Sequence, residues 1–90
     1  MRHCVYVLIS NFNNKFITYV GYTSNIKNRL KLHNSSKGAK FTRGRKWKVI
    51  YKKYYISKSI ALKNEYKLKI DRNKRNLIKE NYIKKIKKNK

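Results

Sequence analysis

The 90-residue sequence predicts a mixed α/β domain of the α+β type, with three strands and about three helices. Three runs rich in β-branched and aromatic residues have the length of strands. Three other segments repeat apolar residues at helical spacing. The chain is 40% apolar and 13% aromatic, and its net charge is +23. Disordered chains carry fewer apolar and aromatic residues, so we expect a folded domain despite the charge.

The first two strands are expected over residues 4–9 and 16–22. The segment between them contains three asparagines and a serine, which are typical of turns. Such a short polar gap favours an antiparallel hairpin. The hairpin would place Tyr6 and Tyr19 on neighbouring strands.

A helix is expected over about residues 25–34, because a serine and an asparagine at its start can cap it. Ile26 and Leu30 form its apolar side. Arg29 and His33 fall on the same side, at the i, i+3, i+4, i+7 spacing of a helix face. Arg29 is therefore either an inward-facing functional residue or a side chain that snorkels at the edge of the apolar face.

The segment over residues 34–46 is expected to be a loop, since it contains two glycines and many polar residues. Phe41 lies within its basic residues, and a third strand follows over residues 47–56. We expect the first residue of that strand, Trp47, to pack in the core. Five basic side chains of the loop are candidates for contacts with DNA phosphates: Lys37, Lys40, Arg43, Arg45 and Lys46.

A second helix is expected over about residues 57–70 and a third over about residues 72–88, packed on the sheet. Glu65 falls within the apolar side of the second helix. A carboxylate there is costly unless it is paired or holds a cation, so Glu65 either binds a metal or pairs with one of many lysines. The apolar side of this helix is expected to contain Ala61, Leu62, Tyr66 and Leu68.

Composition excludes several classes of site. Cys4 is the only cysteine, so neither an intrachain disulfide nor a cysteine-rich zinc site is possible, and we expect a buried thiol in the reducing cytoplasm. The chain has three acidic residues, so a bound metal would use one or two carboxylates. No apolar run approaches the about 18 residues of a membrane span, and we expect no membrane partner.

The inward-facing polar residues together suggest phosphodiester chemistry. Glu65 is a candidate ligand for one Mg²⁺. Arg29 has the guanidinium that clamps a phosphate. Tyr6 or His33 could take a proton from an attacking water, although a free phenol has a pKa of about 10 and would need nearby positive charge. Each residue also has a purely structural interpretation, as a core aromatic, a helix-end cation or a partner of lysine.

Two short motifs extend this pattern: Val5-Tyr6-Val7, and Tyr19-Val20-Gly21 with Arg29 ten residues after its tyrosine. With them the sequence resembles the GIY-YIG nuclease superfamily over about residues 3–80. Three further segments are similar to its small stand-alone bacterial members: His33-Asn34, residues 37–44 and residues 58–69.

The resemblance implies a three-stranded antiparallel sheet flanked by helices. It also implies metal-dependent hydrolysis of DNA with Mg²⁺ or Mn²⁺. By the same resemblance, Tyr6 is the general base or positions the water, and Tyr19 supports the base and the phosphate. Arg29 would bind the phosphate, His33 would assist proton transfer, and Glu65 would bind the metal.

The leading hypothesis is a small DNA endonuclease of low sequence specificity, acting on single-stranded or branched DNA if Phe41 or Trp47 stacks on an unpaired base. We expect a nuclease domain over residues 1–82, a basic tail over residues 83–90, and a monomer or weak dimer. DNA repair is one of several processes that such an enzyme could serve. The alternative is a basic nucleic-acid-binding module without catalysis. A third hypothesis is a membrane-surface protein that uses residues 72–90 as an amphipathic helix.

Overall fold

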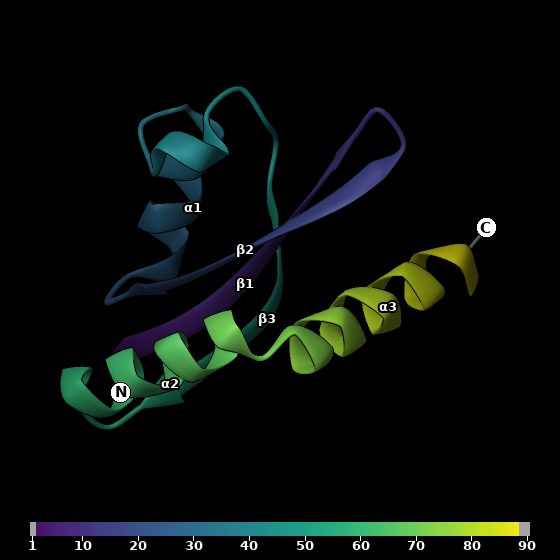
Figure 1. The fold of residues 1–90 in the computed structure, drawn as a ribbon. Coiled ribbons are helices and arrows are strands. Elements are labelled where there is room, and N and C mark those ends of the chain that lie inside the picture. Colours follow the sequence, from purple (N-terminus) through teal and green to yellow (C-terminus); the bar gives the residue numbers. More distant parts are fainter. Residues whose placement is uncertain (1, 89–90) are drawn as a thin grey trace.

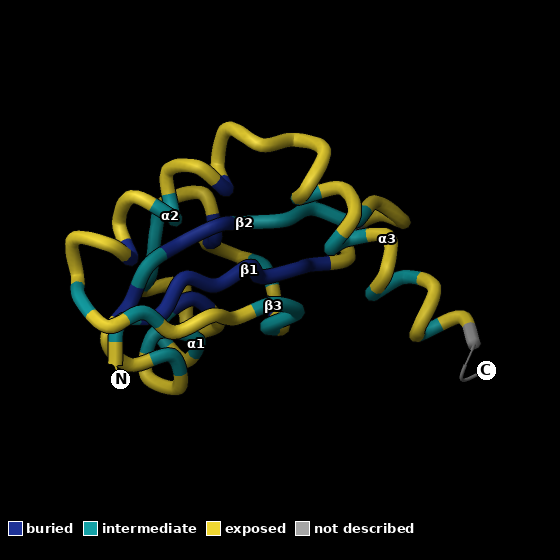
Figure 2. The backbone as a smooth tube through the Cα atoms, turned by 90° about the horizontal axis from the view of Figure 1, so that it is seen from below, coloured by how far each residue is buried: buried dark blue, intermediate teal, exposed yellow. Residues whose placement is uncertain are grey.

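A three-stranded antiparallel sheet in the order β2-β1-β3 organises the computed structural model, which describes residues 2–88 (Figure 1). The central position of β1 makes it the most continuously buried segment of the chain (Figure 2). The predicted fold class and the antiparallel hairpin are confirmed. The strands are β1 (His3–Phe12), β2 (Lys15–Thr23) and β3 (Lys48–Tyr55).

The hairpin turn is shorter than its sequence suggests. Strand pairing continues to Phe12 opposite Lys15, which leaves Asn13 and Asn14 as the turn. Both asparagines have positive φ, 53° and 63°. Two left-handed residues define the turn type whose twist matches an antiparallel pair, and asparagine tolerates this conformation better than most residues.

The alternation of side chains along β1 divides the core between the two faces of the sheet. On one face, Val5 and Val7 pack with residues of β2 and of the second and third helices. On the other face, Cys4, Tyr6 and Leu8 pack with Trp47 and the first helix. The sheet therefore separates two hydrophobic clusters, and Tyr6 belongs to the cluster on the side of the first helix.

The predicted helices are confirmed, and two of them begin at capping residues. The side chain of Asn25 accepts a hydrogen bond from the backbone N–H of Asn28 at 3.1 Å. Ser57 caps the second helix in the same way through Ile60, at 3.2 Å. Such side chains satisfy backbone donors that have no partner within the helix. The helices are α1 (Ile26–Asn34), α2 (Lys58–Ile70) and α3 (Arg72–Lys88).

Helix α3 continues from the end of α2 and extends past the sheet (Figure 1). Its Ile78 packs against the cluster that contains Val5 and Val7, so the expected packing of this helix on the sheet is confirmed. Residues 89 and 90 of the expected basic tail lie outside the described residues. Within the described part of the chain, no helix is long and apolar enough to cross a membrane.

One expectation for α2 is wrong. Leu62 and Tyr66 do not join the core, because these residues are 40% and 64% exposed. The contact of α2 with the core cluster is a narrow strip through Ala61 and Leu68, which are two helical turns apart. A small sheet covers only part of the apolar surface that this helix presents.

Replacing Asn14 with valine is expected to lower the free energy of unfolding by about 1–2 kcal/mol, because a β-branched residue resists left-handed backbone geometry. Replacing Asn14 with glycine is expected to leave that free energy unchanged or to raise it. Chemical denaturation of the two variants beside the wild type measures both effects. Equal losses in both variants would contradict the left-handed turn.

Candidate active site

The phenol of Tyr6 meets the imidazole of His33 inside the protein. Tyr6 lies opposite Gly21 on β2, and its ring crosses that strand toward the end of α1. The Tyr6 hydroxyl oxygen and His33 Nε2 are 2.9 Å apart. Both residues are at most 2% exposed. A β-carbon at position 21 would overlap the Tyr6 hydroxyl, so glycine permits this approach.

His33 is held from its other ring nitrogen by the loop that follows α1. Its Nδ1 lies 2.8 Å from the Thr42 hydroxyl oxygen. That hydroxyl donates a hydrogen bond to the carbonyl of Ala39, also at 2.8 Å. A β-carbon at Gly38 would overlap His33 Nδ1. Thr42 is fully buried in the short 3-10 helix η1 (Lys40–Thr42).

Tyr19 is the centre of an aromatic cluster beside this pair. Its ring contacts His33 edge-on at 5.2 Å between centroids, and Tyr6 at 6.5 Å. It stacks on Phe41 at 6.2 Å and meets Trp47 at 6.4 Å. Among residues 2–88, no hydrogen bond involves the Tyr19 hydroxyl. The structure thus brings Tyr19 together with the buried pair and leaves its hydroxyl free for another partner.

Arg29 and Glu65 approach the pair from different helices. Arg29 lies half-buried on α1, and its charge acts on both Tyr6 and His33. Glu65 lies on α2, with its side chain 18% exposed, and its charge also acts on Tyr6. The structure thus brings Tyr6, Tyr19 and His33 into contact, while Arg29 and Glu65 act on Tyr6 through their charges.

Burial keeps the central pair uncharged. It raises the pKa of Tyr6, and the neighbouring Tyr19 raises this pKa further. The charge of Arg29 lowers the pKa of Tyr6, as the sequence led us to expect, but burial outweighs it. Burial also lowers the pKa of His33, and the charge of Arg29 lowers it further. Near neutral pH the phenol keeps its proton and the imidazole lacks its second one.

Glu65 fits a metal site in which few of the ligands come from the protein. Its carboxylate is 3.7 Å from the ammonium of Lys69, one helical turn away. That distance exceeds a charge-assisted hydrogen bond, so the carboxylate retains capacity for a cation. Across residues 2–88, no group of three or more His, Cys, Asp or Glu side chains converges. Mg²⁺ needs only one or two carboxylates, because phosphate oxygens and water complete its coordination.

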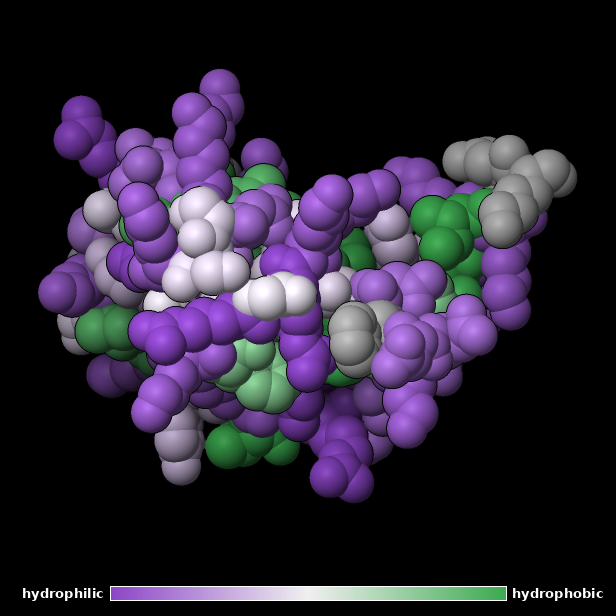
Figure 3. Space-filling view, turned by 90° about the horizontal axis from the view of Figure 1, so that it is seen from above, coloured by the Kyte–Doolittle hydropathy of each residue, from purple (hydrophilic) through white to green (hydrophobic). Residues whose placement is uncertain are grey.

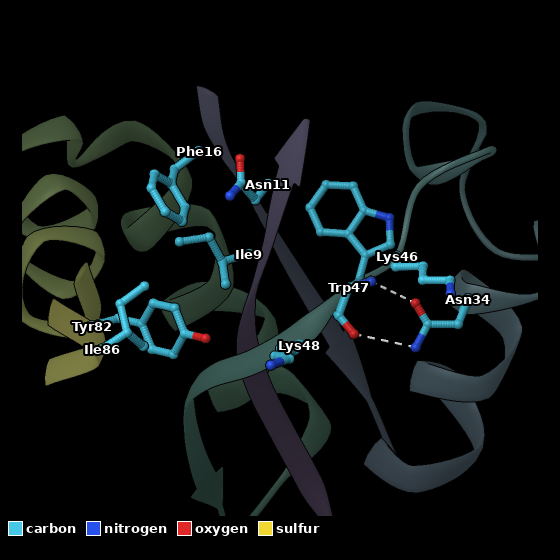
Figure 4. A pocket seen from close by; sticks show the side chains of 9 residues that line it. All are labelled: Ile9, Asn11, Phe16, Asn34, Lys46, Trp47, Lys48, Tyr82 and Ile86. Carbon is cyan, nitrogen blue, oxygen red and sulfur yellow. Dashed lines mark hydrogen bonds between the residues drawn. The ribbon is translucent and has the colours of Figure 1, made fainter. Parts of the chain in front are cut away.

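Asn34 joins the two ends of the basic loop, residues 34–46, through hydrogen bonds to the backbone of Trp47. Asn34 accepts a hydrogen bond from the Trp47 N–H at 2.6 Å and donates one to the Trp47 carbonyl at 3.2 Å (Figure 4). The Trp47 indole N–H donates to the Thr42 carbonyl at 3.0 Å. These bonds join the end of α1 to the start of β3. They hold the loop against the end of α1, although no individual role was predicted for Asn34 or Thr42 from the sequence.

The five predicted phosphate contacts differ in exposure. Arg45 is half-buried, and its guanidinium lies 5.6 Å from the centre of the Phe41 ring. Hydrophilic side chains cover much of the face seen in Figure 3. The exposed members of the set are Lys37, Lys40, Arg43 and Lys46.

The two aromatic residues of this region have different environments. Trp47 is 2% exposed, so the prediction that it packs in the core is confirmed, whereas Phe41 is 53% exposed. A cavity of about 640 Å³ opens beside Trp47, between the hairpin and α3 (Figure 4). None of the five candidate catalytic residues lines it, so it is separate from the site.

The free energy of unfolding is expected to fall as pH drops below about 6.5, the ordinary pKa of histidine. His33 has a lower pKa in the folded protein, so the unfolded chain takes up the proton first. This contribution is complete above about 6.5 and is lost as pH falls through the folded-state pKa. Denaturation curves between about pH 5 and 8 should show a shallower pH dependence for His33→Gln. An unchanged dependence would contradict a neutral buried His33.

The chain is similar to known proteins over most of its length. Residues 2–90 match the family described as the GIY-YIG catalytic domain. A UPF0213 protein of Oceanobacillus iheyensis is 44% identical over 69 residues, which cover 76% of this chain and 77% of that protein. UPF0213 proteins of Staphylococcus haemolyticus and Staphylococcus epidermidis are 39% and 38% identical, each over 76% of this chain and 80% of the relative. No solved structure matches the chain.

Nucleases with this catalytic domain act on nucleic acid and generally use divalent metal ions. The predicted resemblance, carried by the two tyrosine motifs, is thereby confirmed. The chain belongs to the GIY-YIG catalytic-domain family and is a nuclease of that endonuclease superfamily.

Proposed function

We propose that this nuclease hydrolyses phosphodiester bonds of DNA with low sequence specificity, using Mg²⁺ or Mn²⁺. The observation that carries the proposal is the buried Tyr6–His33 hydrogen bond within electrostatic reach of Arg29 and Glu65. Proton acceptors, a phosphate-binding cation and a metal-binding carboxylate are the groups that this reaction requires.

The water proton is removed through Tyr6 rather than by a preformed tyrosinate. Because burial keeps Tyr6 protonated, its oxygen can accept a proton only as its own proton leaves. His33 Nε2, at 2.9 Å, is placed to receive that proton. The water oxygen bonds to phosphorus, and the bond from phosphorus to the leaving oxygen breaks with its electron pair on that oxygen, which takes a proton from solvent. His33 ends with one additional proton.

The remaining residues act on the phosphate. Arg29 supplies a guanidinium that holds the non-bridging phosphate oxygens. The free hydroxyl of Tyr19 is available to donate to the same phosphate. Glu65 would hold the divalent metal, which when bound neutralises charge on the phosphate and the leaving oxygen.

The distribution of charge supports DNA as the partner. The net charge of +23 favours a polyanion, and the loop that carries four exposed cations also supplies Thr42, which contacts His33. Contacts to phosphates position DNA without reading its sequence, which supports low specificity. Phe41 is exposed and already belongs to an aromatic stack, which favours single-stranded or branched DNA with an unpaired base.

We further propose a cytoplasmic protein that is a monomer or weak dimer. The buried free thiol of Cys4 supports a reducing compartment. A nuclease domain over residues 1–82 with a basic tail over residues 83–90, and a role in DNA repair, are proposals of the same kind. A basic binding module without catalysis is the competing function, and the following substitution distinguishes the two.

Replacing Glu65 with glutamine is expected to reduce cleavage by about 100-fold or more, because a metal supplies several kcal/mol of transition-state stabilisation. DNA binding should persist or tighten, since one negative charge is lost. The matched control is Glu80→Gln, which makes the same change at an exposed position on α3. Labelled single-stranded, duplex and branched DNA, each incubated with Mg²⁺, Mn²⁺ or a chelator, provides the measurement. Equal cleavage by both variants would contradict a metal role for Glu65.

Replacing Lys37 and Lys40 together with glutamine is expected to weaken the salt dependence of duplex binding. Each lost phosphate contact lowers the slope of log affinity against log salt by about 0.9. The control pair is Lys63 and Lys67, which are exposed on α2. Binding measured over a range of salt concentrations should show the larger change for the loop pair. The same change in both pairs would contradict a specific role for the loop.

A further inference from the structure

We propose that Thr42 is a positioning residue, which fixes the tautomer of His33 that carries hydrogen on Nδ1 and leaves Nε2 free to accept the proton of Tyr6. The catalytic consequence rests on the proposed function. The tautomer itself is a property of the folded chain and can be measured without DNA or metal.

The hydrogen bonds around Thr42 have a definite direction. Its hydroxyl has one hydrogen, which is donated to the Ala39 carbonyl at 2.8 Å. The same oxygen lies 2.8 Å from His33 Nδ1. Because the only hydroxyl hydrogen is already used, His33 Nδ1 must be the donor in this second bond.

A neutral imidazole carries hydrogen on one nitrogen only. With hydrogen on Nδ1, the Nε2 atom is an acceptor. It lies 2.9 Å from the Tyr6 hydroxyl, so Tyr6 donates. The resulting chain of bonds runs from Tyr6 through His33 and Thr42 to the carbonyl of Ala39, and every donor has an acceptor.

The opposite tautomer leaves buried groups without partners. Thr42 would have to turn its hydrogen toward Nδ1, and its oxygen would then face the Ala39 oxygen at 2.8 Å with no hydrogen between them. Tyr6 would receive a hydrogen bond from Nε2, and its own hydrogen would have no acceptor among the described residues. Tyr6, His33 and Thr42 are each at most 2% exposed, so water cannot replace these bonds cheaply.

The position of Thr42 is itself determined by its surroundings. Its backbone N–H donates to the Ala39 carbonyl at 3.0 Å, within η1. Its own carbonyl accepts the indole N–H of Trp47 at 3.0 Å. Gly38 provides the space in which the imidazole approaches the hydroxyl. The loop thus presents the Thr42 oxygen at a fixed place beside His33.

The tautomer determines whether proton transfer from Tyr6 is possible. When Nε2 takes the Tyr6 proton, His33 carries hydrogen on both nitrogens, and Thr42 still accepts the hydrogen of Nδ1. In the opposite tautomer Nε2 already carries hydrogen and has no lone pair for the Tyr6 proton. Thr42 therefore acts on the reaction through His33 and without touching DNA.

The test begins with the tautomer. Long-range ¹H–¹⁵N NMR spectra of the full chain, without DNA or metal, distinguish the two forms of His33. We expect hydrogen on Nδ1 in the wild type and in Thr42→Ser, which keeps the hydroxyl. Thr42→Val, which keeps the branched shape and loses the hydroxyl, should shift His33 toward the Nε2 form. His3 provides an internal reference in each spectrum, and His33→Gln assigns the signals.

The second arm measures DNA cleavage. Thr42→Val should lower kcat by about 100-fold, the range expected for general acid–base catalysis, with little change in KM. Thr42→Ser should retain activity within a few-fold. A purely structural role would instead change stability and KM together, and Trp47 fluorescence reports whether the variant folds.

Three outcomes decide the proposal. Hydrogen on Nε2 in the wild type would overturn it, even if Thr42→Val failed to fold. A folded Thr42→Val that keeps both the wild-type tautomer and the wild-type rate would overturn it as well. Hydrogen on Nδ1 in a wild-type protein that cleaves no DNA would support the tautomer assignment and contradict the proposed nuclease mechanism.

Discussion

The hydrogen bond between Tyr6 and His33 joins the central strand to α1, and both residues are at most 2% exposed. The residues around this hydrogen bond leave space for the two rings and satisfy the second nitrogen of His33. Glycine at position 21 makes room for the phenol, and glycine at position 38 makes room for the imidazole. Thr42 completes the set by occupying the second nitrogen of His33. Burial keeps both the phenol and the imidazole uncharged near neutral pH, and the proposed proton transfer starts from this neutral pair.

The proposed function divides binding and chemistry between different parts of this small domain. The excess of positive charge is spread over the surface, where it attracts a polyanion from any direction. The groups proposed for the chemistry are few: one guanidinium from α1, one carboxylate from α2, and the buried pair, on whose Tyr6 both charges act. Loop residues 35–46 link the two parts, since the loop carries exposed cations and also supplies Thr42. A basic binding module would need the charge but not this arrangement.

The sequence predicted most of the fold, because strand runs, capping residues and helical spacing are local signals. It also identified Arg29 and Glu65 as unusual charges on apolar faces. Two kinds of feature could not be predicted in this way. The exposure of Leu62 depends on how little of α2 the sheet covers, and the pKa of Tyr6 depends on burial outweighing Arg29. Thr42 gave no signal of its own, since its role comes from the fold of a loop, although it lies in a segment that resembles the family.

The most direct test of the account is single-turnover cleavage of labelled DNA by Tyr6→Phe, beside its affinity for the same DNA. This change removes one hydroxyl and keeps the ring that fills the core. The account predicts a rate lower by about 100-fold or more, with unchanged affinity, because the path from water to His33 is broken. Cleavage by Tyr6→Phe at the wild-type rate would show that the buried pair serves the fold and takes no part in the reaction.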